Sequence, residues 1–202
     1  MVFEEFCTNY IDVIVIHTVG SLEFHKSKVK EVLLQIRDAD LRISFDKCSF
    51  FGRSIKYLVF NINEDGSTPH ERNIKLFLRR PFPESNKALK WLVASANYYR
   101  NYIENFAEIT YHLDNILKKK YRKLIWNDNA KESYKKLINA MSNPKFCHYS
   151  VLEDDFILTT ASSNHSIGSA LSQIRNGEEV SISFYSKQLF STKKNDVLRI
   201  KN

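Results

Sequence analysis

The sequence has few cysteines, and it lacks the patterns on which several classes of protein depend. Its cysteines, Cys7, Cys48 and Cys147, lie far apart, are odd in number and form no Cys-x-x-Cys pair. This argues against a disulfide framework and a zinc ribbon, and it favours a reducing, intracellular compartment. The six histidines form no His-Glu-x-x-His motif, which argues against a zinc protease helix.

Long apolar runs and leader segments are missing as well. No apolar run reaches the length that spans a bilayer. The first residues, MVFEEFCTNY, are acidic rather than basic, unlike those of a signal peptide. We therefore expect an intracellular protein with no membrane partner.

What is present is typical of a globular chain with an excess of positive charge. Hydrophobic residues make up 43% and charged residues 26% of 202 positions, enough to bury a core in one large or two small domains. The formal net charge is +7. Two interpretations stay open: a polyanionic partner, for which nucleic acid is the usual candidate, or a charge that serves solubility alone.

The first part of the chain alternates between strand and helix patterns. Residues 10–17 are rich in isoleucine and valine and predict a strand with Asp12 inside it. A charge at such a position is costly unless it is satisfied or used. Ser21 is expected to cap an amphipathic helix over residues 22–39. Two short strands and a turn are expected to follow, at residues 41–45, 57–63 and 64–66.

Helical patterns dominate the middle of the chain. Arg79 and Arg80, next to Pro81, predict a linker whose arginines face solvent. Ser85 is expected to cap the first of three amphipathic helices, and Pro144 is expected to follow the last. The apolar faces of these helices run through residues 88–96, 106–117 and 134–141.

Strand patterns return in the last part of the chain. Strands are predicted over residues 156–160 and 180–185, with a turn at Asn176 and Gly177. Residues 166–173 predict a helix or a turn. The order of elements predicts an α+β fold of two or three small modules rather than one doubly wound sheet.

Several short phrases, taken in order, resemble the Pol polyprotein of gypsy-type retrotransposons. NYID, at residues 9–12, is similar to the YxDD box of reverse transcriptases. KALKWLVASANYYRNYI, at residues 87–103, resembles the LRxFLGLxNYYRxFI segment of that family. FILTTASSNHSIGSALSQ, at residues 156–173, resembles its FxLxTDASxxGIGAVLxQ segment, and SISFYSKQL at residues 181–189 resembles the strand that follows. The resemblance covers nearly the whole chain.

The resemblance implies a particular domain order. It implies a partial reverse-transcriptase palm hairpin and helix, a helical thumb or connection, and the start of an RNase H-like α/β domain. The implied boundaries are residues 1–78 for the end of the palm with its primer-grip hairpin, 79–145 for the thumb or connection, and 146–202 for the truncated RNase H-like domain. The fingers and the first half of the palm would lie upstream.

Both active-site phrases depart from the family pattern at a carboxylate. Nucleotidyl transfer by two metal ions needs carboxylates around two cations about 4 Å apart, which are Mg²⁺ in the intact family. Asp12 matches the first aspartate of the box, but the second position is Val13. The aspartate position of the RNase H-like phrase is Ala161, and the next carboxylate position falls on Asn202. We therefore expect no metal site, no cofactor and neither activity in this chain.

The carboxylates that remain also have ordinary structural interpretations. Asp12 is a common residue type for the turn of a hairpin, and the resemblance alone favours a catalytic remnant. Asp154 and Asp155 lie near the RNase H-like phrase and are expected in a solvated turn.

Residues that the resemblance assigns to nucleic-acid binding are better preserved. Tyr57 and Phe60 would belong to the primer grip, although Val59 replaces a family glycine there. Tyr98 and Tyr99 match the thumb phrase, and one of the two is expected in the core. Arg100, in the same phrase, is expected to face the template–primer duplex, and Ala94 replaces a second family glycine.

A basic run after the second helix of the middle segment completes the binding candidates. Its cations are Lys118, Lys119, Lys120, Arg122 and Lys123. Such a run follows a phosphate backbone in many nucleic-acid-binding proteins. The alternative is that lysines at a helix C-terminus offset the helix dipole.

The expected function is that of a fragment of a retrotransposon-derived RNA-directed DNA polymerase with linked RNase H, without catalysis. The expected partner is an RNA–DNA hybrid or template–primer nucleic acid. Two alternatives stay open: a non-catalytic module that binds RNA–DNA hybrids, and a pseudogene product without function.

Overall fold

A computed structural model of the chain describes residues 6–119 and 124–189 and confirms the α+β class. The chain divides into two compact units, residues 1–52 and 53–202. The three predicted domain boundaries differ from this division and stay a prediction.

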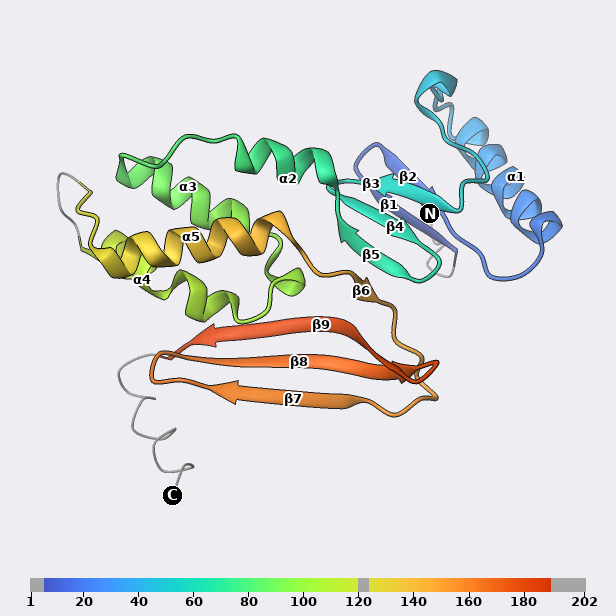
Figure 1. Cartoon of the computed structure of the whole chain (residues 1–202). Coiled ribbons are helices and arrows are strands. Elements are labelled where there is room, and N and C mark those ends of the chain that lie inside the picture. The colour runs from blue at the N-terminus through green and yellow to red at the C-terminus, as the bar shows by residue number, and fades with distance from the viewer. Residues whose placement is uncertain (1–5, 120–123, 190–202) are drawn as a thin grey trace. The chain divides into compact units, whose positions relative to one another are not determined.

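The first unit contains a hairpin and a helix (Figure 1). Its elements are β1 (Cys7–Tyr10), β2 (Val13–Ile16), α1 (Leu22–Asp38) and the 3₁₀ turn Phe45–Lys47. β1 and β2 are antiparallel, and the pair Tyr10 and Val13 closes a turn made of Ile11 and Asp12. The prediction of one strand over residues 10–17 is therefore wrong, because the chain reverses at Asp12. The strand predicted over residues 41–45 is also wrong, since the 3₁₀ turn begins at Phe45.

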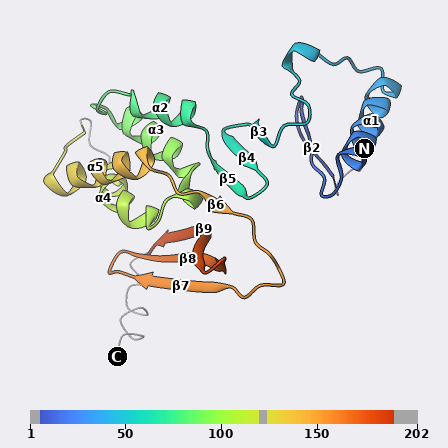
Figure 2. The ribbon, with the colours of Figure 1, turned by 45° about the vertical axis from the view of Figure 1, so that its right-hand side comes forward.

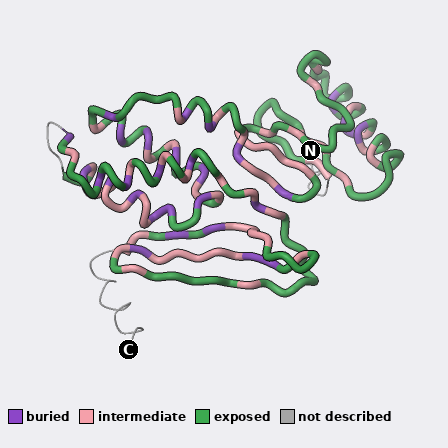
Figure 3. Tube along the Cα trace, in the orientation of Figure 1, coloured by how far each residue is buried: buried purple, intermediate pink, exposed green. Residues whose placement is uncertain are grey.

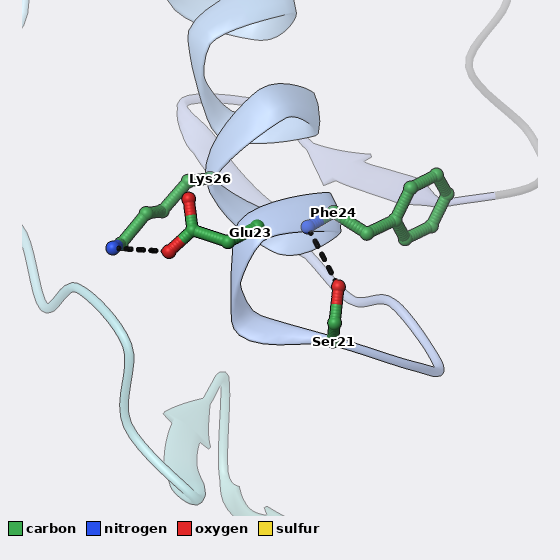
Figure 4. A network of polar contacts seen from close by, with 4 residues as sticks. All are labelled: Ser21, Glu23, Phe24 and Lys26. Atoms are coloured by element: carbon green, nitrogen blue, oxygen red, sulfur yellow. Dashed lines mark hydrogen bonds and ion pairs between the residues drawn. The ribbon is translucent and has the colours of Figure 1, made fainter.

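The N-terminus of α1 is fixed by the cap that the sequence predicts. The Ser21 hydroxyl accepts a hydrogen bond of 3.2 Å from the backbone N–H of Phe24 (Figure 4). Glu23 in the first turn complements the helix dipole and pairs with Lys26 at 2.8 Å. Both side chains of that pair are exposed, so the pair adds little stability. The cap confirms the predicted helix.

The second unit begins with a small antiparallel sheet. Its strands, in spatial order, are β3 (Ser54–Tyr57), β4 (Phe60–Asn63), β5 (Gly66–Pro69) and β6 (Cys147–His148). β3 and β4 are joined by a turn at Leu58 and Val59, so the single strand predicted over residues 57–63 is wrong. The turn predicted after Asn63 is confirmed, because the Asn63 side chain accepts hydrogen bonds from the N–H groups of Asp65 and Gly66. β6 joins the sheet by pairing with β5, which no local pattern predicts.

Gly66 on β5 lies in close contact with the backbone of β6, and its replacement is a direct test of this pairing. A Cβ atom at Gly66 would lie 2.1 Å from the Cys147 carbonyl oxygen and 2.8 Å from the His148 Cα. Both are backbone atoms of the partner strand, so they cannot move without breaking the pair. We expect Gly66→Ala to lower the free energy of unfolding by roughly 1–3 kcal/mol, measured by urea denaturation.

Gly168→Ala provides the comparison for this variant. A Cβ atom there would lie 2.5 Å from the Asn105 Oδ1, which is the end of a side chain that can rotate. The loss of stability should therefore be smaller than for Gly66→Ala. Equal losses would contradict the tight β5–β6 contact.

Helices form the main core of the second unit (Figures 1 and 3). They are α2 (Glu71–Leu78), α3 (Asn86–Asn97), α4 (Phe106–Lys118) and α5 (Asp128–Ser142), with the 3₁₀ turn Arg100–Tyr102 between α3 and α4. The predicted cap at Ser85 is confirmed, since its hydroxyl accepts a hydrogen bond from the N–H of Ala88. Asn127, which was not predicted as a cap, accepts one from the N–H of Ala130 at the start of α5. Leu89, Leu113 and Leu137 are fully buried, one from each of α3, α4 and α5. These three predicted helices are confirmed, whereas α2 is not predicted by the pattern.

A second antiparallel sheet follows, in the order β7 (Ile157–Ser162), β8 (Ser166–Arg175) and β9 (Glu178–Gln188). The helix or turn predicted over residues 166–173 is wrong, because this segment is paired on both sides. The turn at Asn176 and Gly177 is confirmed, with φ of 52° and 82°. Helix α4 packs against β8 and β9, and β7 forms the far edge of the sheet (Figures 1 and 2).

Candidate nucleic-acid interface

A groove with a volume of about 1040 Å³ runs between α3 and α4 and ends at the last residues of β9. Its apolar floor includes Val93, Phe106 and Leu117, which also belong to or pack on the helical core. Helix periodicity places Lys87, Lys90 and Ala94 along one side of α3, because residues three and four apart share a face. The groove is therefore a consequence of how α3 and α4 pack and of small side chains such as Ala94.

The groove is strongly basic. Among the described residues that line it, the cations are Lys87, Lys90, Arg100, Lys118 and Lys187, and Asp114 is the one carboxylate. In the part of the chain that the structure describes, no ion pair engages Lys87 or Lys90. Their ammonium groups are exposed and attract an anion with little competition.

Asp114 is the acidic exception in the groove, and it is held by β9. Its Oδ2 accepts a hydrogen bond of 2.5 Å from the Gln188 Nε2. Burial raises the pKa of the Asp114 carboxyl, against the opposing effects of the hydrogen bonds from Gln188 and Thr110 and of the Lys118 charge. The carboxylate form therefore destabilises the fold relative to the protonated form.

Glu108 lies six residues earlier on α4, and its pKa is shifted in the opposite direction. Its Oε2 accepts hydrogen bonds from the hydroxyls of Ser163 at 2.6 Å and Ser166 at 2.7 Å. Burial alone would raise the pKa of Glu108, but these hydroxyls, with His165 and His112 nearby, outweigh it and lower the pKa. The ionised form of Glu108 thus connects α4 by hydrogen bonds to the loop after β7 and to the first residue of β8.

These two carboxylates predict stability effects of opposite sign. The lowered pKa of Glu108 means that its stabilisation is complete above the unfolded pKa and is lost as the pH falls through the folded pKa. The raised pKa of Asp114 means that its stabilisation is complete below the unfolded pKa and is lost as the pH rises through the folded pKa. At pH 7 we expect Glu108→Gln to destabilise the protein by roughly 1.5–3 kcal/mol, the range for hydrogen bonds to a charged group. Asp114→Asn should stabilise it.

Urea unfolding at neutral pH and near pH 4 measures both effects. At the lower pH the carboxyl groups of the parent become protonated and are then uncharged, like the amides of the variants. The difference in the free energy of unfolding between each variant and the parent should therefore become smaller. Two variants that changed stability in the same direction at pH 7 would contradict this account.

Three of the four aromatic residues predicted to bind nucleic acid, Phe60, Tyr98 and Tyr99, form a cluster in the second unit. Phe60 lies near-parallel to Tyr98, with ring centroids 5.7 Å apart, and to Tyr102, at 5.3 Å. Tyr99 is buried and Tyr98 is 56% exposed, so Tyr99 is the core tyrosine and Tyr98 faces outward. Tyr57 lies at the end of β3 and is half-buried. Phe60 thus serves packing first, and the binding roles of these residues stay predictions.

Two of the cations predicted to bind nucleic acid, Arg100 and Lys118, line the groove. Arg100 donates a hydrogen bond to the Ser186 carbonyl oxygen and another, of 3.3 Å, to the Asn97 Oδ1, so it ties the segment after α3 to β9 while lining the groove. Lys118 ends α4 at the rim of the groove, and Lys119 follows it, exposed. The other members of the basic run, Lys120, Arg122 and Lys123, lie outside the described residues. In the linker, Arg79 and Arg80 are both exposed, as predicted, and the Arg80 guanidinium also lies 4.1 Å from the centre of the Trp91 ring.

The residues at the catalytic positions do not fit a magnesium site. Asp12 is an exposed turn residue beside Val13, and Ala161 on β7 offers a methyl group opposite Gly168. Asn202 lies outside the described residues. Within the described residues, no group of three or more His, Cys, Asp or Glu is placed to hold a metal ion. Asp154 and Asp155 lie exposed in the loop before β7, as expected for a solvated turn.

Sequence patterns missed several residues that matter here. Lys87, Lys90 and Lys187 line the groove, and the spacing of Lys87 and Lys90 in KALK was the available signal. Gln173 was also missed. It is fully buried, and its amide donates to the Val151 and Asp154 carbonyl oxygens at 2.6 and 3.1 Å, which holds the loop before β7.

Comparison with solved structures defines the class of fold. The chain superposes on a foamy viral protease–reverse transcriptase in complex with double-stranded DNA with a TM-score of 0.80 at 16% identity, covering 93% of this chain and 33% of that one. A foamy viral protease–reverse transcriptase in complex with an RNA/DNA hybrid gives a TM-score of 0.76 at 16% identity, covering 93% of this chain and 25% of that one. The chain therefore has the fold of a part of a reverse transcriptase.

Sequence comparison finds relatives of this chain among retrotransposon proteins. Residues 126–197 match the RNase H-like domain found in reverse transcriptase. Over 179 residues, 88% of this chain, it is 27% identical to the retrovirus-related Pol polyprotein from transposon 412 of Drosophila melanogaster. Over 181 residues, 89% of this chain, it is 29% identical to the Tf2-3 transposon polyprotein of Schizosaccharomyces pombe. The homologues of this chain are retrotransposon Pol polyproteins.

The chain corresponds to a small part of each of these relatives. The chain spans 14% of the transposon 412 protein and 13% of the Tf2-3 polyprotein. The predicted gypsy subtype is compatible with these relatives and stays a prediction. Within the described residues, none of the helices combines the length and the apolar character that crossing a membrane requires.

Proposed function

We propose that this chain binds duplex nucleic acid, in particular an RNA–DNA hybrid, and catalyses neither DNA synthesis nor RNA cleavage. The observation that carries the proposal is the basic groove between α3 and α4, with five lysines and arginines against one carboxylate among its described lining residues. The similar solved structures hold double-stranded DNA or an RNA/DNA hybrid, which supports a nucleic-acid partner.

The groove has the features that a phosphate backbone requires. Lysines contribute mobile point charges, and Asn97 offers an amide within the same groove. Among the described residues that line the groove, Arg100 and Gln188 are of types that read bases, but Arg100 binds the Ser186 carbonyl oxygen and Gln188 binds Asp114. The expected binding therefore follows the backbone and is weakly dependent on sequence.

Lack of catalysis follows from the carboxylate positions. A two-metal reaction needs several carboxylates at one point, and Asp12 with Val13 supplies one. The RNase H-like position is Ala161, which has no oxygen to coordinate a cation. The proposal is therefore a binding protein derived from an enzyme.

The test is binding of the purified chain to a labelled RNA–DNA hybrid across a salt series. Phosphate contacts release counterions, with a logarithmic slope of about −0.9 for each one on a B-form duplex, so five cations predict a slope of roughly −4 to −5. Affinity should fall by roughly 10²–10³-fold between about 50 and 200 mM salt. Binding that does not change with salt, or no binding by a monodisperse protein, would refute the proposal.

Restoring the missing aspartate should not restore synthesis. Val13→Asp provides adjacent carboxylates at the hairpin turn, but the resemblance implies that a two-metal site draws a further aspartate from an earlier strand of the palm. We expect no primer extension by this variant with Mg²⁺ and deoxynucleotides, measured on a denaturing gel beside an active reverse transcriptase. Extension above the level of the parent chain would show that the metal site is more complete than proposed.

A product without function is the second candidate, and the first unit favours it. In the β1–β2 hairpin, Ile11 is 85% exposed, and Tyr10, Val13 and Ile14 are also exposed. Apolar side chains on a two-stranded sheet promote association with other chains. Light scattering distinguishes the two candidates, since a chain that only aggregates at the concentrations used for binding supports the second.

A further inference from the structure

A second cavity, separate from the groove, lies where β4, β5, β6 and β9 meet the segment after α3. Its volume is about 460 Å³. Its wall is aromatic, with Phe60, Tyr98, Tyr102, His148 and Tyr149, and the described residues that line it include no lysine, arginine, aspartate or glutamate. We call this cavity the aromatic pocket.

The rings of the aromatic pocket are arranged as a stack that remains open at one end. Phe60 lies 15° from parallel with Tyr98 and 28° from parallel with Tyr102, at centroid distances typical of offset stacking. Tyr98 is nevertheless 56% exposed, and Tyr149, which also lines the pocket, is 47% exposed. Two large aromatic side chains of one cavity thus have surface available for a further flat ring.

Three polar side chains of the aromatic pocket, those of Tyr102, Tyr149 and Cys147, are neutral hydrogen-bonding groups. Burial raises the pKa of the Tyr102 and Tyr149 hydroxyls and raises that of the Cys147 thiol to about 11, so all three are protonated at neutral pH. The Tyr102 hydroxyl is 2.8 Å from the Ser67 hydroxyl, which fixes its ring. Asn101 is exposed at the edge, and its amide combines donor and acceptor groups.

We propose that the aromatic pocket binds one unpaired nucleobase, which stacks on Tyr98 and Tyr149 and exchanges hydrogen bonds with Asn101. A flat heterocycle matches a stack of rings with hydroxyl and amide groups beside it, whereas a phosphate meets no lysine or arginine among the described lining residues. The inference rests on the proposed function, because the groove would deliver the strand that carries the base. It adds a second kind of contact, since groove binding is electrostatic and pocket binding is stacking.

The test compares two RNA–DNA hybrids that differ in one unpaired terminal nucleotide, which carries adenine in one and is abasic in the other. The full chain should bind the hybrid with adenine about tenfold more tightly, as expected for one stacked base. This ratio should stay constant across the salt series, because the described lining of the pocket carries no lysine or arginine. The overall affinity should still fall with salt.

Tyr149→Ala tests the pocket itself, and Tyr185→Ala is the matched control. Tyr149 is 47% and Tyr185 53% exposed, so both variants remove an outward tyrosine ring, but Tyr185 lies outside the pocket. Tyr149→Ala should abolish the preference for adenine and leave binding of the abasic hybrid unchanged, while Tyr185→Ala should retain the preference. Equal binding of the two hybrids by the parent chain would overturn the pocket and leave the groove intact. Binding of neither hybrid would overturn both proposals.

Discussion

Replacing Lys87 and Lys90 together by glutamine is expected to weaken binding of an RNA–DNA hybrid by roughly 10- to 100-fold at low salt. Both residues lie on α3 at the wall of the groove, and no ion pair within the described chain engages either of them. Each lysine that contacts a phosphate contributes about one to the salt slope, so the slope should fall by about two. Glutamine keeps a long side chain and the helix propensity, and the fold should not change.

The control is the same double substitution on α5. Lys135 and Lys136 are exposed and adjacent, and they do not line the groove. Replacing both removes the same charge as replacing Lys87 and Lys90. Lys136 lies 3.8 Å from Glu132, but an exposed pair of this kind contributes little stability. Lys135→Gln with Lys136→Gln should leave the affinity within about twofold of the parent, as expected of charges outside the contact area. Equal losses for the two pairs would mean that net charge, rather than the groove, governs binding.

Leu113→Ala is expected to lower the free energy of unfolding by roughly 2–5 kcal/mol. Leu113 is fully buried at the centre of α4, the helix that packs against both α5 and the second sheet. Truncation removes the transfer free energy of the side chain and leaves a cavity that a packed helix pair fills only in part. Because α4 forms one wall of the groove, the variant should also bind nucleic acid less well near its unfolding midpoint.

Urea unfolding followed by tryptophan fluorescence measures this loss in the second unit alone. Both tryptophans, Trp91 and Trp126, lie in residues 53–202. Leu158→Ala is the matched control, since Leu158 is 64% exposed on β7, and its effect should stay within about 0.5 kcal/mol. A loss at Leu113 no greater than that at Leu158 would contradict the burial of α4.

Local signals predicted the parts of the fold that are decided locally. Ser21 and Ser85 cap the helices that the sequence assigns to them, and the apolar spacing of α3, α4 and α5 matches their buried faces. The turn at Asn176 and Gly177 was predicted because these residue types adopt a positive φ at little cost. In each case the residue that decides the structure is within a few positions of the structure it decides.

The strand patterns missed two turns, although the resemblance implied a hairpin in each place, because the residue types in these turns are unusual for a turn. Ile11 and Leu58 adopt φ of 54° and 56°, a conformation that side chains of their kind rarely take. A search for glycine or asparagine therefore extends each strand through its turn. The prediction for residues 166–173 was wrong for a different reason. The serine, glycine and alanine residues of β8 have low strand propensity, and β8 forms a strand because it pairs with β7 and β9.

The candidate site was predicted only in part, because it is assembled from distant segments. The resemblance pointed to Arg100 and the basic run pointed to Lys118, and both residues line the groove. Lys187 lies on β9, and no local pattern connects it with Lys87, one hundred residues earlier. Asp114 likewise became notable only when the structure placed it beside Gln188. The groove is a property of packing between α3, α4 and β9, and helical periodicity alone does not encode that packing.

The measurement that tests the central claim most directly is lysine acylation of the chain with and without a saturating RNA–DNA hybrid, quantified by mass spectrometry. Binding in the groove between α3 and α4 predicts protection of Lys87, Lys90 and Lys187, with unchanged rates at Lys131, Lys135 and Lys136 on α5. Equal protection of both sets, or protection confined to α5, would contradict the groove as the nucleic-acid interface.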